Sequence, residues 1–599
     1  MPPSRPELLG TSGAVASTHW LASSAAMRIM ADGGNAFDAA VAAGFVLQVV
    51  EPHFNGLGGD VSILAHQAGG QEAREICGQG PMPAAATRGA FAELGLTVIP
   101  GSGLLPACVP GAFGGWMRLL AEFGTLRLED VLRPAIRYAD DGFPLLPETS
   151  HAIEVLAPLF REEWHGSART YLPDGKVPAA GSRFRNPALA TTYRRLVAEA
   201  TSASPDREAQ IGAALDAFYQ GFVAEKIGEF LASGPVLDAT GRRHRGLLTP
   251  DDLARWRPSV REAPSFSYGS YRVSKPGPWS QGPVFLQQLA LLRGFDLASL
   301  EPGGADYVHT VTECAKLAMA DREAWYGDPD FTEVPLDALL DEGYNRERAA
   351  LVGREASWEL RPGAPGGRTS FLAPSPAADD PEPVSPWMAQ LRNGLPTVLR
   401  ETTTKGDTCT VVVVDRWGNM VAATPSGGWL KSSPAIGDLG FSLGTRGQCL
   451  FLVEGHPNSL VPGKRPRTTL SPTLVQRDGR PFLAFGTPGG DRQDQWTLQF
   501  FLNVVDFGLD LQLATETTAF HTDQVPASFT PHVHRPGVLV VEETCDPGTV
   551  RELWRRGHEV EVVPAYSLGR VCAAGFTKDG ELVRAAASPR GRHAYAMCE

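Results

Sequence analysis

The stretch that decides how this chain folds is KGDTCTVVVVD, residues 405–415. Ahead of it, residues 361–396 contain eight prolines and little periodicity, which is typical of a mobile connector. Residues 410–415 are rich in β-branched side chains and predict a buried strand. A turn at 416–419 and a second strand at 420–424 are predicted to follow. Thr408 therefore stands where a connector meets a buried strand, a junction that suits cleavage of the chain by itself.

Thr408 has the chemistry of a nucleophile once the chain is cut between Asp407 and Thr408. A threonine hydroxyl holds its proton at pH 7 and attacks poorly. Cleavage would add a free α-amino group to the same residue, and such groups have a reference pKa of about 7.7–8.0. The amine can accept the hydroxyl proton, so Thr408 would carry its own base. The alternative is a threonine at a strand edge with no part in catalysis.

Composition narrows the class of protein. The 599 residues are 43% hydrophobic and 20% charged, as in globular proteins. The net charge of −13 disfavours nucleic acid and anionic membrane as partners. The eight cysteines include no C-x-x-C pair, so we expect no metal, no cofactor, and free thiols in the cytoplasm. We expect no signal peptide, and no run of 18 apolar residues predicts a transmembrane helix.

The N-terminal region predicts a strand at 13–17 and helices at 21–31 and 36–50. Asn35 can cap the second helix, with Asp38 three residues further on. That helix is apolar on all sides, which predicts that it is buried. The glycine-rich residues 51–60 lack the spacing of a phosphate-binding loop, so we do not expect nucleotide binding.

The rest of the chain predicts helices and then strands. Residues 109–340 are expected to be mainly helical, for example at 113–123, 128–141 and 307–325. His309 lies on the last of these helices, where a lone histidine is more often structural than catalytic. The tail predicts strands at 538–542, 558–563, 570–576 and 581–586. Together these patterns indicate an α/β (α+β) protein with stacked sheets flanked by helices.

A second candidate for the chemistry is GTPGG, residues 486–490, which leads into a helix predicted at 493–505. Backbone N–H groups at a helix N-terminus can stabilise a negative charge. The segment could therefore form an oxyanion hole for acyl transfer. A plain turn between strand and helix is the alternative.

Eight short motifs occur in an order that resembles the gamma-glutamyltranspeptidase family of N-terminal-nucleophile hydrolases. Each is weak alone, but jointly they are specific and extend over nearly the whole chain. They are GGNAFDAA at 33–40, VEPH at 50–53, GLGG at 56–59, VPG at 109–111, ADR at 320–322, GDPD at 327–330, LSPT at 470–473 and PGG at 488–490.

The resemblance implies a four-layer αββα sandwich and a precursor that cleaves itself. Residues 1–407, with a proline-rich connector at 353–407, would form the large subunit, and residues 408–599 the small subunit. The two would form one intertwined domain as an αβ heterodimer, and two heterodimers could pair as (αβ)2.

The resemblance also assigns roles around the nucleophile Thr408. Ser426 corresponds to a hydroxyl that supports the amino group of the nucleophile, and Thr424 to a second hydroxyl nearby. Gly489 and Gly490 would supply the N–H groups of the oxyanion hole.

The residues that should clamp a gamma-glutamyl group are mostly replaced. Gln79 stands where the family has an arginine for the substrate's α-carboxylate, and a neutral amide cannot replace a bidentate guanidinium. Gly428 replaces an asparagine, and the acidic pair that holds the α-ammonium falls on Gln448 and Cys449. Two serines of the family correspond to Thr468 and Thr469.

Arg446 lies close in sequence to the lost acidic pair, as in oxamate-amidohydrolase-like members of the family. It could bind a carboxylate of the substrate, or it could be a surface arginine paired with Asp or Glu. We expect a threonine-nucleophile amidohydrolase or acyltransferase acting on a small amide that carries a carboxylate.

Three other functions stay open. The first is a gamma-glutamyl hydrolase or transpeptidase with altered contacts. The second is a non-catalytic binding relative. The third is a serine hydrolase that uses GFSLG at 440–444, a motif that needs a preceding strand and a following helix.

Overall fold

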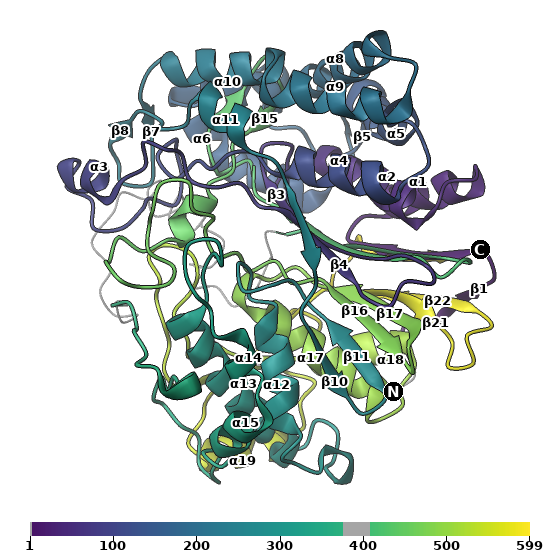
Figure 1. Cartoon of the computed structure of the whole chain (residues 1–599), viewed down its shortest axis with the longest axis vertical. Helices are drawn as coiled ribbons and strands as arrows, with labels where there is room; N and C mark the ends of the chain where they lie inside the picture. The colour runs from purple at the N-terminus through teal and green to yellow at the C-terminus, as the bar shows by residue number, and fades with distance from the viewer. Residues whose placement is uncertain (1–2, 375–407) are drawn as a thin grey trace.

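The computed structural model describes residues 3–374 and 408–599 as two seven-stranded sheets stacked face to face, with helices covering both outer faces (Figure 1). The expected four-layer αββα sandwich is confirmed. The predicted connector lies mostly outside the described residues, as does Asp407.

The first sheet contains the strand that follows Thr408. Its order is β23-β2-β12-β13-β3-β4-β9. The strands predicted at 13–17, 410–415 and 420–424 are confirmed as β2, β12 and β13. Strand bounds are β23 Tyr595–Cys598, β2 Gly13–Ser17, β12 Val411–Asp415, β13 Met420–Ser426, β3 Asp60–His66, β4 Arg74–Gly78 and β9 Ser259–Glu262.

The second sheet has the order β1-β22-β21-β17-β16-β11-β10. Our expectation of a mainly helical region at 109–340 is wrong over 259–274, which forms β9, β10 and β11. These strands have four residues each, too few for a period of two to be recognised, and pairing with β4 and β16 stabilises them. Strand bounds are β1 Leu8–Gly10, β22 Val583–Ala587, β21 Cys572–Phe576, β17 Arg480–Gly486, β16 Thr473–Arg477, β11 Tyr271–Ser274 and β10 Ser265–Tyr268.

One group of helices packs on the outer face of the first sheet (Figure 1). Helix α2 is its centre: all fifteen of its residues are buried, and Asn35 and Asp38 form the predicted capping box. The group comprises α1 Trp20–Ala31, α2 Ala36–Val50, α4 Ala112–Phe123, α5 Leu128–Asp141, α6 Pro147–Glu162, α7 His165–Tyr171, α8 Pro187–Ala203, α9 Arg207–Tyr219, α10 Phe222–Ala232 and α11 Pro250–Arg255; the short α3 Arg88–Glu93 lies at the side.

A second group of helices covers the outer face of the other sheet (Figure 1). It comprises α12 Pro283–Leu292, α13 Ala305–Trp325, α14 Leu336–Leu339, α15 Glu342–Ala349, α17 Gln493–Val505, α18 Leu511–Glu516 and α19 Pro547–Arg555.

Smaller sheets complete the described part of the chain. The strands predicted at 538–542 and 558–563 form a separate three-stranded sheet, outside the two main ones. The small sheets are β18 Phe520–Thr522, β19 Val538–Glu542 and β20 Glu559–Val563; β5 Phe143–Pro144 with β6 Arg183–Phe184; β7 Val236–Leu237 with β8 Arg243–His244; and β14 Ala435–Ile436 with β15 Phe441–Ser442.

The space between the main sheets is filled largely by alanine and valine. Small side chains let two sheets stack without voids. The filling residues include Ala14, Ala16, Val412, Val414, Ala422, Ala484, Ala574, Ala585 and Ala587. This interior is closed and apolar along most of its length.

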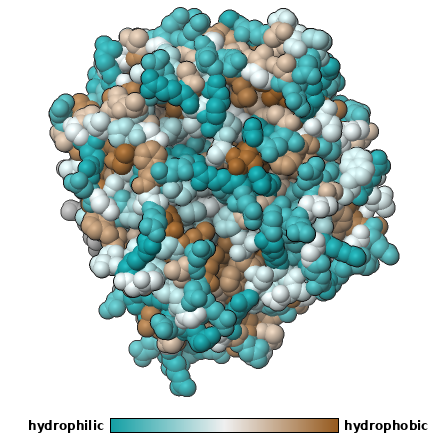
Figure 2. Space-filling model, viewed as in Figure 1, coloured by the Kyte–Doolittle hydropathy of each residue, from teal (hydrophilic) through white to brown (hydrophobic). Residues whose placement is uncertain are grey.

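The surface shown in Figure 2 is mostly hydrophilic, with apolar residues in scattered groups. Among the helices of the described residues, none combines the length and apolar character that a bilayer crossing requires.

Candidate active site

The candidate nucleophile lies in a row of residues that crosses the first sheet. Thr408 forms an isolated antiparallel bridge with Ser426, and Ser426 pairs with Asp60 in the β13–β3 register. Val61 pairs with Gly78, so one further step in that register places Gln79 opposite Asp60. Side chains of paired residues project from the same face of a sheet. The row therefore places Ser426 beside Thr408, Asp60 on the next strand, and Gln79 just past the end of β4.

This row faces the space between the two sheets. Cys409 and Val411 pack into the core on the helix-covered side, whereas Val412 packs between the sheets. Because side chains alternate along a strand, Thr408 and Thr410 project between the sheets. The interior thus changes from apolar to hydroxyl-lined at this end of the sandwich.

The second sheet meets the row at the end of β17. A Cβ placed on Gly486 would lie 3.1 Å from Cγ2 of Thr410 and 3.5 Å from Cγ2 of Thr424. The GTPGG segment therefore begins directly across from these threonines. The stacking of the two sheets therefore brings together two segments that are distant from each other in the sequence.

Gly489 and Gly490 have backbones that disfavour other residues. Their φ angles are +136° and +57°, in the region that favours glycine. A Cβ on Gly489 would also lie 2.2 Å from Cζ3 of Trp496 on α17. The loop therefore requires glycine at 489 for conformation and for space.

Thr408 is buried, with 3% of its surface exposed. Its Oγ1 lies 3.2 Å from Oγ of Ser426, within hydrogen-bonding distance. The backbone N–H of Cys409 donates to the carbonyl of Pro425 at 2.9 Å, which holds the start of the strand against β13. Thr424 is fully buried, and its Oγ1 has no hydrogen-bond partner among the described residues. Two hydroxyls therefore lie along the strand next to Thr408, as predicted.

Cys409, the residue after the candidate nucleophile, is fixed by a cluster that we did not predict. The thiol of Cys409 donates to Oε2 of Glu51 at 3.0 Å, and the hydroxyl of Thr18 donates to the same oxygen at 2.6 Å. Nδ2 of Asn55 donates to Sγ of Cys409 at 3.1 Å. Burial raises the pKa of Glu51, and the Thr18 hydrogen bond opposes that rise only in part. The polar residues of the EPHFN stretch at 51–55 are the sequence signal that could have indicated this cluster.

Arg446 is buried, not on the surface, and it pairs with Asp60. It begins a short 3-10 helix at Arg446–Cys449 and is 3% exposed. Its Nε and Nη2 donate to the two carboxylate oxygens of Asp60 at 2.8 Å and 3.0 Å. Burial alone would lower the pKa of Arg446, but the Asp60 carboxylate more than offsets this, so the net shift is upward.

The guanidinium of Arg446 lies 5.4 Å from the ring centres of both Trp429 and Phe529. Its buried Nη1 has no hydrogen-bond partner among the described residues. Asp60 thus fixes one edge of the guanidinium beside the row, while Nη1 remains able to bind a further acceptor.

The other predicted substrate contacts are buried, and apart from Gln79 they lie outside the row. Nε2 of Gln79 donates to the carbonyl of Gly80 at 3.1 Å, so this side chain is partly satisfied locally. Nε2 of Gln448 donates to the carbonyl of Gly101 at 3.1 Å. Thr468 pairs with Ser280 in an isolated bridge, and Oγ1 of Thr469 has no partner among the described residues. No direct contact is seen between these threonines and Thr408 in the described residues.

The GFSLG motif lacks the setting of a nucleophile elbow. Ser442 ends the two-residue strand β15, is 1% exposed, and is followed by a 3-10 helix, not an α-helix. A strand–turn–α-helix unit is required to present such a serine.

One group in the described part of the chain brings metal-ligand types together, namely His309, Glu313 and His558. Nδ1 of His309 and Nε2 of His558 are hydrogen-bonded at 2.9 Å. Glu313 is already paired with Lys316 at 2.7 Å and with Arg361 at 3.3 Å. Two cations on the only carboxylate oppose a further divalent cation, so the arrangement favours a structural cluster.

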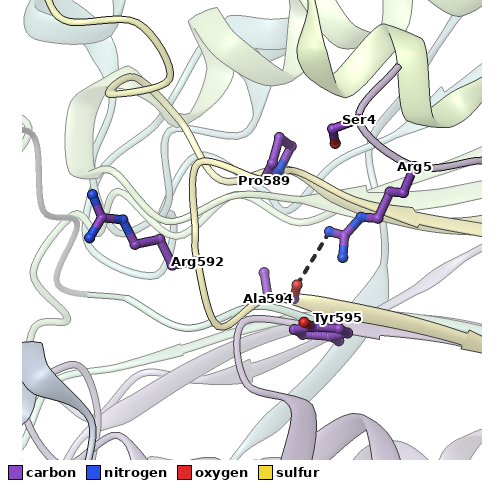
Figure 3. A pocket seen from close by; sticks show the side chains of 6 residues that line it. All are labelled: Ser4, Arg5, Pro589, Arg592, Ala594 and Tyr595. Atoms are coloured by element: carbon purple, nitrogen blue, oxygen red, sulfur yellow. Dashed lines mark hydrogen bonds between the residues drawn. The ribbon is translucent and has the colours of Figure 1, made fainter. Parts of the chain in front are cut away.

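A cavity of about 200 Å³ lies at the junction of the N-terminal segment with residues 589–595 (Figure 3). Arg5 donates there to the carbonyl of Ala594, whereas the side chain of Arg592 points away from Arg5. The two guanidinium groups do not converge on one point, and none of the predicted site residues lines this cavity.

Comparison with known proteins agrees with this architecture. The family model of gamma-glutamyltranspeptidase matches residues 22–598. The glutathione hydrolase-like YwrD proenzyme of Bacillus subtilis (strain 168) is 31% identical over 592 residues, covering 98% of each chain.

Solved structures are also similar over the whole chain, and two of them illustrate this similarity. The structure of LmbA2991HD superposes with a TM-score of 0.92 at 51% identity, covering 100% of both chains. Cephalosporin acylase from Bacillus halodurans superposes with a TM-score of 0.82 at 27% identity, covering 100% of this chain and 98% of its own. The chain therefore belongs to the gamma-glutamyltranspeptidase family of N-terminal-nucleophile hydrolases, and it is an amide hydrolase or acyltransferase of that family.

Proposed function

We propose that the chain cleaves itself between Asp407 and Thr408 and then hydrolyses a small amide through an acyl-enzyme on Thr408. The observation that carries this proposal is the buried Thr408 hydroxyl, 3.2 Å from that of Ser426 and on the face that meets the glycine loop. Relatives with 31% identity are named proenzymes, which agrees with a cut during maturation.

The reaction uses groups that the row and the loop bring together. Oγ1 of Thr408 attacks the amide carbonyl while the new α-amino group accepts the hydroxyl proton. The backbone N–H groups of Gly489 and Gly490 hold the negative charge on the carbonyl oxygen. The α-amino group passes the proton to the leaving amine, which departs and leaves an ester on Thr408. Water then attacks the ester and releases the acid, or an amine attacks and yields a new amide.

We assign the substrate to short amides that carry a carboxylate on the acyl side. Arg446 keeps one buried guanidinium nitrogen without a partner among the described residues, and Asp60 fixes the orientation of the group beside the row. Trp429 and Phe529 flank the same guanidinium and exclude water from it. A carboxylate there would gain a charge-assisted hydrogen bond in a site of low dielectric.

A gamma-glutamyl substrate is the second candidate, because a relative at 31% identity is named glutathione hydrolase-like. Against it, Gln79 is a neutral amide that donates to its own neighbour Gly80. Turnover of acid amides with and without an α-ammonium group would separate the two substrate classes.

The test of self-cleavage is the N-terminal sequence and intact mass of the purified protein. We expect a fragment that begins Thr-Cys-Thr, a chain with Thr408→Ala that stays uncut and inactive, and partial cutting with Thr408→Ser. Thr410→Val is the matched control, since Thr410 lies two residues further on the same face but is not the nucleophile. A folded wild-type chain that stays uncut after long incubation would overturn the mechanism and would favour a non-catalytic binding relative.

We further propose that the two fragments stay together as an αβ heterodimer, which could pair as (αβ)2, in the cytoplasm. All eight cysteines are free thiols and seven of them are buried, which suits a reducing compartment.

A further inference from the structure

We propose that Arg322 is a positioning residue that holds the Gly489–Gly490 loop in its catalytic geometry, through Asp491 and Gln281. This inference rests on the proposed function, because it takes that loop as the oxyanion hole. The loop needs external support, since neither glycine has a side chain with which to anchor itself.

One nitrogen of Arg322 binds two side chains that hold Gly490: that of Asp491, the next residue, and that of Gln281, which contacts the Gly490 carbonyl. Arg322 lies on α13 and is fully buried. Its Nη1 donates to Oδ1 of Asp491 at 2.6 Å and to Oε1 of Gln281 at 2.8 Å. Nε2 of Gln281 in turn donates to the carbonyl of Gly490 at 3.3 Å. The guanidinium therefore positions the Gly490 carbonyl through Gln281, and it positions the following residue, Asp491, directly.

Asp491 is held by the chain on its other side as well. Ser528 donates to it twice, from Oγ to Oδ1 at 2.5 Å and from the backbone N–H to Oδ2 at 3.0 Å. Burial alone would raise the pKa of Asp491, but the charge of Arg322 outweighs this, so its pKa is lowered and it stays ionised. An ionised carboxylate with three donors has little freedom to rotate.

The cluster around Arg322 is balanced in charge. Nε of Arg322 donates to Oε1 of Glu323 at 2.9 Å, and Nη2 of Arg467 donates to both oxygens of Glu323 at 2.8 Å and 3.1 Å. Two cations and two carboxylates thus form one buried network. Both carboxylates and all guanidinium nitrogens of the network except Nε of Arg467 have partners among the described residues. A buried network satisfied to this extent makes its surroundings rigid, which is the property needed to fix two backbone N–H groups.

The experiment compares Gln281→Leu, Asp491→Asn and Arg322→Lys with wild type on a series of ω-carboxyacyl p-nitroanilides. A displacement of the oxyanion donors by about 1 Å can lower the rate by roughly 10²-fold. We expect kcat to fall by about that factor while KM changes less than about threefold, because the substrate contacts are unaltered. A second readout is the rate at which p-nitrophenyl acetate acylates Thr408, followed by intact mass.

Arg348→Lys is the matched control. Arg348 is also buried and pairs at 3.3 Å with Asp321, the residue beside Arg322 on α13. Its hydrogen bonds within the described residues go to Leu317, Asp321 and Arg361, and none goes to the loop at 489–491. Arg348→Lys should disturb helix α13 about as much as Arg322→Lys does, but it should leave kcat close to that of wild type. If Arg322→Lys fails to fold, the kcat values of Gln281→Leu and Asp491→Asn test the positioning role.

The outcomes separate the two proposals. A wild-type chain that is not acylated at Thr408 overturns the proposed function, and the positioning role with it. Acylation in wild type with unchanged kcat in Gln281→Leu and Asp491→Asn overturns the positioning role alone. An equal loss in Arg348→Lys, or a rise in KM without a fall in kcat, also overturns it, because either result indicates general damage to α13 or to binding.

Discussion

Removal of the Arg446 charge tests both the stability of the site and its choice of substrate. Arg446→Met keeps much of the bulk but leaves the Asp60 carboxylate, which is 4% exposed, without the two donors at 2.8 Å and 3.0 Å. Breaking one partner of a buried ion pair costs about 3–5 kcal/mol. That is a large part of the stability of an ordinary domain, so the melting temperature should fall by several degrees.

The double variant Arg446→Met with Asp60→Asn should recover most of this loss, because no uncompensated charge remains. All stability measurements should be made on variants that also carry Thr408→Ala, because that chain is expected to stay uncleaved. Arg194→Met provides the exposed control: Arg194 pairs with Asp140 at the surface, with side chains 49% and 42% exposed, and such pairs contribute at most about 1 kcal/mol.

The same double variant, with Thr408 intact, tests carboxylate recognition without the confounding buried charge. For an acid amide, kcat/KM should fall by a factor equivalent to about 2–4 kcal/mol, which is roughly 30- to 700-fold. A neutral amide of the same length should lose far less. Equal losses on both substrates would show that Arg446 is structural. A double variant as unstable as Arg446→Met would refute the ion-pair reasoning itself.

Three further outcomes follow from the geometry. Gly489→Ala should cost at least about 1–3 kcal/mol of strain and lower kcat, because φ is +136° and the methyl would lie 2.2 Å from Trp496; normal kcat and melting temperature would contradict the required glycine. Glutathione turnover should be about 10²–10⁴-fold weaker in kcat/KM than that of the best acid amide, since two charge-assisted anchors are missing, and comparable turnover would contradict the assignment of Gln79. The hydrogen bond with His593 lowers the pKa of Glu148 to about 2 from 4.5, so this contact stabilises the fold above about pH 4.5 and is lost as the pH falls towards 2. Glu148→Gln should therefore reduce the drop in melting temperature between pH 6 and pH 3; an unchanged drop would show that the contact contributes nothing.

Long periodic elements were predictable from local sequence. Helix α2 begins and ends where the cap and the apolar pattern predict, and α17 has the predicted bounds. Strand β12 also agrees to within one residue. The short strands β9 to β11 were missed because their stability comes from partners far along the chain, which a local pattern does not contain.

The local sequence pattern was equally insufficient for predicting contacts within the candidate site. The resemblance placed Thr408 and Ser426 together, and the register confirms that they are neighbours. Arg446 was expected near the site, but its partner Asp60 lies 386 residues away in the chain, and nothing in the local sequence links the two. Contacts set by the stacking and register of two sheets emerge only from the folded structure.

The position of β12 has a consequence for assembly. Among the described residues, five strand pairs join the region before Thr408 to the region that follows: β2–β12, β2–β23, β3–β13, β11–β16 and β1–β22. Each region alone supplies only part of both main sheets, so neither could close its own core. Two separately synthesised fragments would each expose unpaired strand edges and apolar faces, a state prone to aggregation. The uncut chain would keep the two regions tethered while these strands pair. The proposed cleavage before Thr408 would then break a bond that the paired sheets no longer need.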